Sequence, residues 1–264
     1  MFRTISLVEE EYLMPRHEAV RPMTDGQRTD IITTLVQALP PLSFADAKNI
    51  TAHKGDFIAD IRTTFGKYSM EWTTNQKLVE WQSFYRVHFG LELSFASLQI
   101  PERREGFDRL IVVAQGVTIQ QVFDKCAEKF GAWKYTDQNL DEAVPTNDRD
   151  ASHGSYAIWV RDVVEADEQW KNKSANALSH IGVKGETLLE RLLHELKYYL
   201  ETGEHLDIVN VTLCFGSRHS GGSVPIVDWG DAGRLSVRWY SPGGEFDDLR
   251  CREVVSTAAA KAAV

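Results

Sequence analysis

The stretch SVPIVDWGDAGRLSVRWYSPGGEFDDLRCREVVS, residues 223–256, decides the fold class of this chain. Inside it, RLSVRWY (234–240) places Leu235, Val237 and Trp239 on one face and two arginines and a tyrosine on the other. Alternation with a period of two is typical of a strand that is buried on one face and solvated on the other. The stretch therefore predicts an antiparallel sheet, and its polar face is a candidate binding surface.

Further strand patterns surround this stretch, with Gly, Asp, Ser and Pro in the turns between them. They are RLIVVAQG with a strand at 110–114, SYAIWVRD (155–162), VNVTLCF (209–215), VPIVDW (224–229) and DLRCREVV (248–255). The first, at 110–114, reads as a buried strand leading into a helix.

Helical periodicity dominates the first ninety residues. Helices are predicted over 23–39, 45–50, 57–65 and 78–88, the second starting from the S-x-x-D pattern at Ser43. Later helices are predicted over 119–130, between a T-x-x-Q capping box and Gly131, after Ser174, and within ETLLERLLHELKYYLETG (186–203). In the last helix, the leucine stripe is expected to face the core.

This order of elements predicts an α+β fold, because runs of helices are separated from a terminal run of strands. We expect a mostly helical N-terminal region over 1–92, an α+β domain over 93–256 and a C-terminal tail over 257–264. Residues 1–23 show little periodicity and are expected to form a short strand or an arm. The length of 264 residues allows one or two domains.

Composition excludes several classes of protein. The net charge of −9, from 29 basic and 38 acidic residues, opposes the phosphate backbone, so nucleic acid is not an expected partner. No apolar run reaches about 18 residues, so no membrane span is expected, and acidic residues stand where a signal peptide would be apolar. These features predict a cytoplasmic protein. The three cysteines show no zinc-like spacing, and a Cys214–Cys251 bridge would require an oxidising compartment.

Two patterns could carry catalysis or metal binding, and both have a structural interpretation that we favour. GSRHSGG (216–222) brings Ser217, His219 and Ser220 together, as a hydrolase or transferase would require, but its composition also suits a turn between strands. Glu190 and His194 stand four residues apart on one helix, which suits either two metal ligands or an exposed pair. We assign no catalytic residue, no metal and no cofactor.

An anion could bind where VVAQGVT (112–118) joins a strand to a helix, because the first amides of a helix attract negative charge. With a single glycine and no lysine, packing is the favoured interpretation.

The terminal strands carry the residue types that dominate binding hot spots. Trp229 and Trp239 are expected to lie largely in the core. The candidate contact residues for a protein or small-molecule partner are Arg218, Asp228, Arg234, Arg238 and Tyr240.

Several segments of the chain resemble sequences of a recurrent family of uncharacterised proteins. Ultrasmall candidate-phyla bacteria encode this family, often in several copies. The segments are FDRLIVVAQG, SYAIWVRDVVEADE, KNKSAN, TLLERLLHELKYYLETGEHLDI, TLCFGSR, VP-x-V-x-W and DDLR-x-R-x-VVS, which together span about residues 93–256. The resemblance supplies no activity. It implies variation around the last two hairpins, at Ser220–Ser223, Asp228–Arg234 and Ser241–Asp247.

A sequence that ends in short strands with exchangeable loops also resembles, distantly, the C-type-lectin-like scaffold, without that scaffold's calcium ligands. The resulting hypothesis is a non-enzymatic binding or display module, with N-terminal helices available for self-association into a homo-oligomer. The alternative hypothesis is a subunit of a structural assembly such as a shell, filament or phage-like particle.

Overall fold

The computed structural model describes residues 24–54, 57, 61, 64, 70–152, 154–230 and 232–257. The chain divides into two compact units, residues 1–68 and 69–264. The arm or strand predicted within residues 1–23, most of the helix predicted over 57–65, and the tail at 258–264 lie outside the described residues.

The first unit contains the helices α1 (Asp25–Ala38) and α2 (Phe44–Ala52). Both begin with a capping box, in which a side chain at the N-cap and one three residues later each bond the other's backbone amide. The pairs are Thr24 with Gln27 and Ser43 with Asp46. The S-x-x-D start predicted at Ser43 is therefore confirmed.

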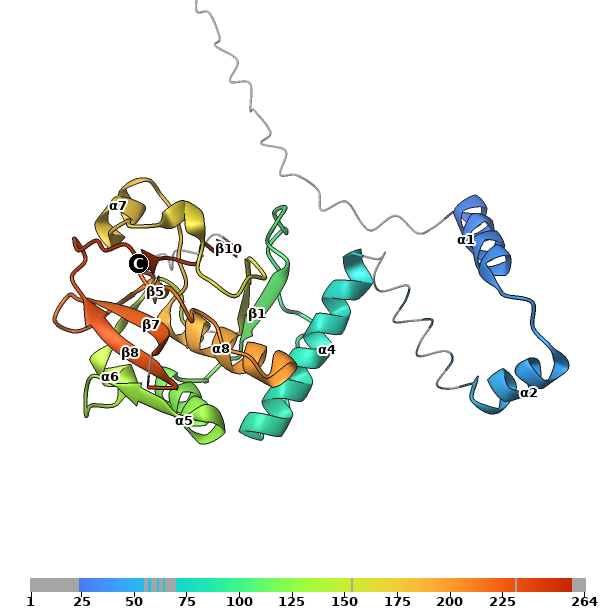
Figure 1. Ribbon diagram of the computed structural model, residues 1–264, viewed down its shortest axis with the longest axis horizontal. Helices are drawn as coiled ribbons and strands as arrows, with labels where there is room; N and C mark the ends of the chain where they lie inside the picture. Colours follow the sequence, from blue (N-terminus) through green and yellow to red (C-terminus); the bar gives the residue numbers. More distant parts are fainter. Residues whose placement is uncertain are drawn as a thin grey trace, which may run out of the picture. The chain divides into compact units, whose positions relative to one another are not determined.

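The second unit is α+β, which confirms the predicted fold class (Figure 1). Its helices are α4 (Met70–Phe89), α5 (Ile119–Phe130), α6 (Leu140–Ala143), α7 (Ala175–His180) and α8 (Leu188–Thr202), with a 3-10 turn at Glu168–Trp170. The capping box of Thr118 and Gln121 begins α5, and Gly131 ends it, as predicted.

In the described part of the second unit, the strands form three sheets. An antiparallel sheet has the order β1 (Arg109–Val113), β4 (Tyr156–Val160), β10 (Val255–Ser256). A mixed sheet has the order β2 (Ala132–Lys134), β8 (Arg234–Tyr240), β7 (Val224–Gly230), β5 (Val211–Leu213), β9 (Leu249–Arg250). The third pairs β3 (Thr146–Asn147) with β6 (Ser217–Arg218).

Helix α4 belongs to the second unit, whereas the predicted boundary lies between residues 92 and 93. Its buried aromatic side chains bond the backbone of β1: Trp81 Nε1 donates to Leu110 O at 3.0 Å, and Tyr85 Oη donates to Val112 O at 2.7 Å. Pairing between a helix and a strand that starts twenty residues later is not visible in local periodicity. The division of the chain therefore falls before α4.

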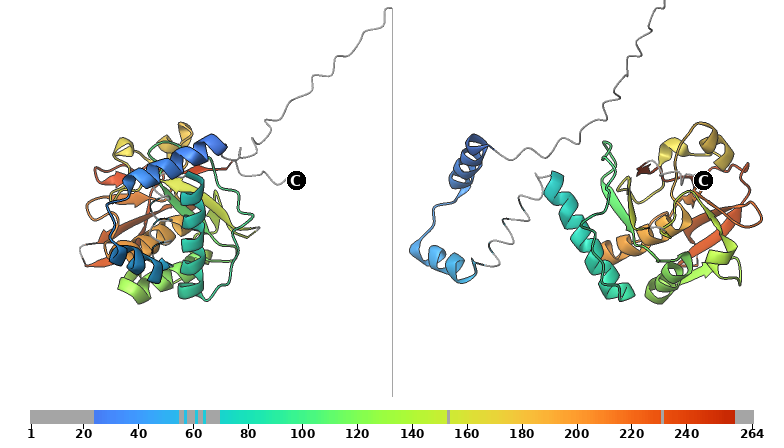
Figure 2. Two further views of the ribbon diagram at one scale, coloured as in Figure 1. Left: turned by 90° about the vertical axis from the view of Figure 1, so that its right-hand side faces the viewer. Right: turned by 180° about the vertical axis from the view of Figure 1, so that it is seen from behind.

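Helix α8 runs through the interior of the second unit. In Figure 1 and from behind in Figure 2, it lies between β1 and α4 on one side and β7 and β8 on the other. Every residue from Leu188 to Tyr198 is buried, polar ones included. Most of the predicted leucine stripe contacts the main core, whereas its last member, Leu200, is exposed. Over Leu188–Tyr198 the remaining faces are enclosed as well, so their charged groups need partners inside the protein.

Asp207 provides the central partner for these charges. Its carboxylate accepts hydrogen bonds from Arg191 Nε at 3.0 Å and from Arg252 Nη2 at 2.7 Å, and all three side chains are almost fully buried. Arg191 also pairs with Glu195 at 2.9 Å. The two arginines hold the pKa of Asp207 below its usual range, against the opposing effect of burial.

All three cysteines are free and buried. Burial raises the pKa of the Cys214 and Cys251 thiols well above their usual range. Both belong to core clusters, Cys251 in a second apolar cluster beneath α7. They therefore act as small apolar core residues in this structure.

Replacing Asp207 with asparagine should destabilise the fold strongly, because Asp207→Asn leaves the buried Arg191 and Arg252 without their shared counter-charge. We expect a loss of about 3–5 kcal/mol in the free energy of unfolding, measured by chemical denaturation. Asp162→Asn is the matched control, since Asp162 pairs with Arg109 at the surface and should cost less than about 1 kcal/mol. Equal losses in the two variants would contradict the central role of Asp207.

Candidate functional site

A shallow pocket of about 390 Å³ lies on the solvated face of the five-stranded sheet, and we call it the sheet-face pocket. The residues that line it come from β2, β7, β8 and the turn between β7 and β8, from the start of β5 and the loop before it, and from the residue before β9. They include Trp133, Ile208, Val209, Asn210, Asp228, Arg234, Ser236, Arg238 and Asp248. Three of the five predicted contact residues, Asp228, Arg234 and Arg238, therefore lie in one pocket.

Strand register explains this convergence. Trp133 on β2 and Asp228 on β7 both stand opposite Ser236 on β8, so the three side chains form a row across the sheet. Arg234 and Arg238 are two positions before and after Ser236, on the same face of β8. Ser236 thus lies at the centre, with an aromatic ring and a carboxylate on two sides and a guanidinium at each end.

The two arginines differ in their electrostatic environment. Arg238 Nη2 donates to Asp228 Oδ1 at 2.6 Å, with 41% of the Arg238 side chain and 13% of the Asp228 side chain exposed. The guanidinium of Arg234 instead lies 5.5 Å from the centre of the Trp133 ring, a cation–π contact. Within the described residues, no ion pair to Arg234 is found. Arg234 thus presents a positive charge without an ion-pair partner, and Asp248, which also lines the pocket, has no ion pair among the described residues either.

The other two predicted contact residues lie elsewhere. Tyr240 shares the polar face of β8 but packs edge-on against Phe246 at 4.9 Å, beside the apolar cluster under α7. Arg218 on β6 donates through Nη1 to the carbonyl oxygens of Phe215 and Ser217. Both side chains are therefore engaged in holding the fold around them.

The two tryptophans of the terminal strands are partly buried against the main core, and Trp229 also contributes to the lining of the sheet-face pocket. Trp229 stacks on His205 with ring centres 3.3 Å apart, and Trp239 Nε1 donates to Tyr135 O at 3.0 Å. Trp133, by contrast, was absent from the predicted contact residues. Its three-residue strand pairs in parallel with a strand a hundred residues later, and no local signal reports that pairing.

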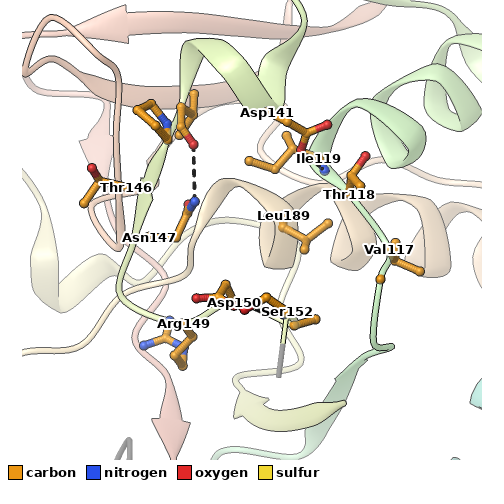
Figure 3. A pocket seen from close by; sticks show the side chains of 14 residues that line it. Val117, Thr118, Ile119, Asp141, Thr146, Asn147, Arg149, Asp150, Ser152 and Leu189 are labelled. Carbon is orange, nitrogen blue, oxygen red and sulfur yellow. Dashed lines mark hydrogen bonds between the residues drawn. The ribbon is translucent and has the colours of Figure 1, made fainter. Parts of the chain in front are cut away.

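A second cavity, of about 520 Å³, lies at the start of α5, and we call it the α5 cavity. Figure 3 shows Thr118 and Asp141 on one side of it, Thr146 and Asn147 on the other, and Leu189 of α8 between them. Its lining combines polar residues such as Thr118 and Asp141 with apolar ones such as Val117 and Leu189, as the linings of many ligand cavities do.

The anion site considered for residues 112–118 is already filled from within the chain. Asp141 Oδ1 accepts from the amide of Ile119 at 2.8 Å, and Asp141 Oδ2 from that of Gln120 at 3.4 Å. A carboxylate in this position satisfies the positive end of the helix dipole. The start of α5 therefore attracts no further anion, which agrees with the favoured packing interpretation.

Ser217 and His219 do not form a nucleophile–base pair. Ser217 is buried, and its Oγ accepts from the amide of Leu188 at 2.8 Å and donates to Asn147 Oδ1 at 2.5 Å. His219 Nδ1 accepts from the amide of Gly221 at 3.0 Å, and its ring contacts Trp239. The serine thus connects the start of α8 to β3, and the histidine shapes the following turn.

Neither interpretation of Glu190 and His194 matches the structure, because both side chains are fully buried and bind different partners. Arg149 donates to both oxygens of Glu190 at 2.7 Å. His194 Nδ1 lies 3.0 Å from Glu186 Oε1. Across the described ranges, no group of His, Cys, Asp and Glu side chains is arranged to hold a metal ion.

Glu186 and His194 form a buried titratable pair. Burial raises the pKa of Glu186 to about 8, against the lowering effect of Arg252 and Arg191. Burial also holds the pKa of His194 well below its usual range, and the same arginines lower it further. The pair therefore carries no net charge near neutral pH. With no exposed atom, it cannot contact a ligand, and its consequence concerns stability.

Glu186→Gln should change how stability depends on pH. Between the usual carboxyl pKa of 4.5 and about 8, the unfolded chain has lost the Glu186 proton while the folded protein retains it. The free energy of unfolding of the wild type should therefore fall with rising pH, by up to about 1.4 kcal/mol per pH unit from this group. His194 is present in both proteins, so its contribution cancels in the difference.

The measurement is chemical denaturation of both proteins at several values from pH 5 to pH 8. We expect the variant to gain stability relative to the wild type as the pH rises. Parallel curves would show that Glu186 is ionised in the folded protein.

Comparison with known proteins supplies no further assignment. No protein-family model matches the chain, and no significant match exists among curated proteins or solved structures. The resemblances stated from the sequence remain predictions. Among the described helices, none is long and apolar enough to cross a membrane. The two cavities and their side chains are therefore the basis on which a function can be proposed.

Proposed function

We propose that this chain is a binding module, without catalytic activity of its own, that takes a partner into the sheet-face pocket. The observation that supports the proposal most directly is the convergence of Trp133, Asp228, Arg234 and Arg238 around Ser236. Tryptophan and arginine dominate interface energetics because they combine large contact areas with directional hydrogen bonds or cation–π contacts. Both are held here on a regular sheet.

The arrangement also favours binding over chemistry. Asp228 is neutralised by Arg238, and Ser236 lies beside neither a histidine nor a lysine in the pocket lining. A hydroxyl without an adjacent base is a weak nucleophile. The other serine considered from the sequence, Ser217, is buried and bound to the backbone of α8.

Photo-crosslinking tests whether this pocket captures a partner. A photoreactive phenylalanine analogue at Ser236 should crosslink a partner in cells, whereas the same analogue at the exposed Glu102, outside the pocket lining, should not. Arg234→Glu should weaken capture by at least about tenfold. Arg86→Glu on α4 is the matched control, since it reverses an exposed arginine outside the pocket lining.

Each variant must unfold at the same denaturant concentration as the wild type for the comparison to hold. Substitution of Tyr240 is not a suitable test, because its packing against Phe246 contributes to the fold. Equal crosslinking from positions 236 and 102, or full capture by Arg234→Glu, would refute binding through the sheet-face pocket.

We propose as a second candidate that the chain is a subunit of a homo-oligomeric assembly, joined through α1. The apolar stripe of α1 is exposed in the described part of the first unit. Its members are Ile31, Ile32, Leu35 and Val36, followed by Leu39 at the C-cap, and Ile32, Val36 and Leu39 are more than half exposed. An unburied stripe of this kind on a helix marks a contact surface.

Light scattering of the full chain tests self-association. We expect a discrete oligomer, converted to a monomer by the double substitution Ile32→Glu and Val36→Glu, because charges on the stripe oppose its burial. A wild type that is monomeric up to about 100 µM would contradict assembly; that concentration corresponds to weak association of roughly 5–6 kcal/mol.

A further inference from the structure

One wall of the sheet-face pocket is a loop fixed by a single carboxylate. Glu165 accepts hydrogen bonds from three successive amides, those of Ile208 at 3.2 Å, Val209 at 3.1 Å and Asn210 at 2.9 Å. The side-chain amide of Asn210 also donates to Glu165, at 2.7 Å. Four hydrogen bonds to one side chain leave this segment of backbone little freedom.

The residue before this loop is anchored equally firmly. Asp207 adopts a left-handed conformation with φ of 55°, which non-glycine residues rarely adopt unless the surroundings impose it. Its buried carboxylate supplies that constraint through Arg191 and Arg252. The core network therefore fixes the direction in which the chain leaves for the surface.

The loop directs two apolar side chains into solvent. Ile208 is 57% exposed and Val209 is 73% exposed, and both line the sheet-face pocket. Single exposed apolar residues are ordinary. Here two adjacent β-branched side chains, which have few rotamers to lose, stand on a backbone bonded to Glu165 and line the same pocket as Trp133 and Arg234. Binding to such a surface costs little conformational entropy.

The unpaired charges of the pocket restrict the partner. Arg238 is compensated by Asp228, whereas Arg234 and Asp248 have no ion pair within the described residues. Of these two, Arg234 lies against the Trp133 ring. A carboxylate on the partner would complement Arg234, and an apolar side chain would cover Ile208 and Val209. A saccharide would satisfy the polar groups but would leave the two aliphatic side chains in water, so it fits the pocket less well.

We propose that the partner is a protein segment carrying an aliphatic or aromatic side chain close in sequence to an aspartate or glutamate. The apolar side chain packs on Ile208 and Val209, and the carboxylate binds Arg234. This inference rests on the proposed function, because it specifies the chemistry of the partner in the same pocket. Glu165 is a positioning residue, which holds the loop in its binding conformation.

The probe is a phage-displayed library of random peptides, selected on the immobilised full-length protein and counter-selected on the double variant Val209→Asp, Arg234→Glu. We expect enriched sequences that combine an acidic residue with Leu, Ile or Phe. Calorimetry with one synthetic peptide should give a Kd that rises at least about tenfold in each single variant. Arg86→Glu and Val163→Asp, at exposed positions outside the pocket lining, are the matched controls.

The role of Glu165 is tested separately with Glu165→Gln, which replaces one acceptor oxygen by a donor. Hydrogen exchange at the amides of residues 208–210 should accelerate, and the Kd for the peptide should rise several-fold through a larger entropic cost. The denaturation midpoint should stay unchanged, because the loop is at the surface. Unchanged exchange at these amides would refute the positioning role.

Two results would overturn the partner chemistry. One is a selection in which no sequence is enriched, and the other is a peptide bound equally by the wild type and by Val209→Asp. Neither result refutes the proposed function, which requires only that a partner bind in the sheet-face pocket. If the partner crosslinked at Ser236 is lost with Arg234→Glu but retained with Val209→Asp, the pocket binds a partner and the apolar contact is refuted. Capture of a saccharide by the sheet-face pocket would likewise support binding there and refute the apolar contact.

Discussion

The structure depends on the enclosure of a charged helix. Because α8 is buried on all sides over most of its length, every ionised group on it requires an opposite charge at a fixed position. Asp207 meets this requirement for Arg191 and also binds Arg252, which lies between β9 and β10. A buried carboxylate paired with two guanidiniums tolerates little displacement. The three segments that carry these residues are therefore held in fixed positions relative to one another.

The same constraint reaches the surface through the neighbours of Asp207. The backbone oxygen of Asp207 accepts from the amide of Trp229 at 3.0 Å, which connects the loop to β7. Two residues of chain then separate the buried network from Asn210, and these are the exposed Ile208 and Val209. The wall of the sheet-face pocket is thus tied by hydrogen bonds both to Glu165 and to β7, although it stands in water. Binding surfaces gain affinity when their shape exists before the partner arrives.

Local patterns in the sequence predicted many of the helices and strands. The parts of the fold and of the pocket that depend on pairing between distant segments were not predicted. Capping signals located the starts of α2 and α5, and alternation identified β8 with its polar face. That face correctly grouped Arg234 with Arg238. Trp133 was not predicted as a contact residue, because a three-residue strand is too short to show the alternation that identifies a strand. The burial of Glu190 and His194 was not predicted either. Amphipathic spacing identifies the apolar side of a helix but does not show whether a second layer of protein covers its polar side.

The long sequence separation of the central ion pairs has a consequence for how the protein is made. Arg252 lies 45 residues after Asp207, and Arg149 reaches Glu190 across 41 residues. A ribosome delivers the chain from its N-terminus, so Asp207 is synthesised well before Arg252, the second guanidinium that it binds. Until Arg252 is made, the buried Asp207 has only Arg191 of α8 as its guanidinium partner, and the network around α8 is incomplete. Completion of the fold therefore waits for the last strands, which makes the timing of synthesis part of the folding pathway.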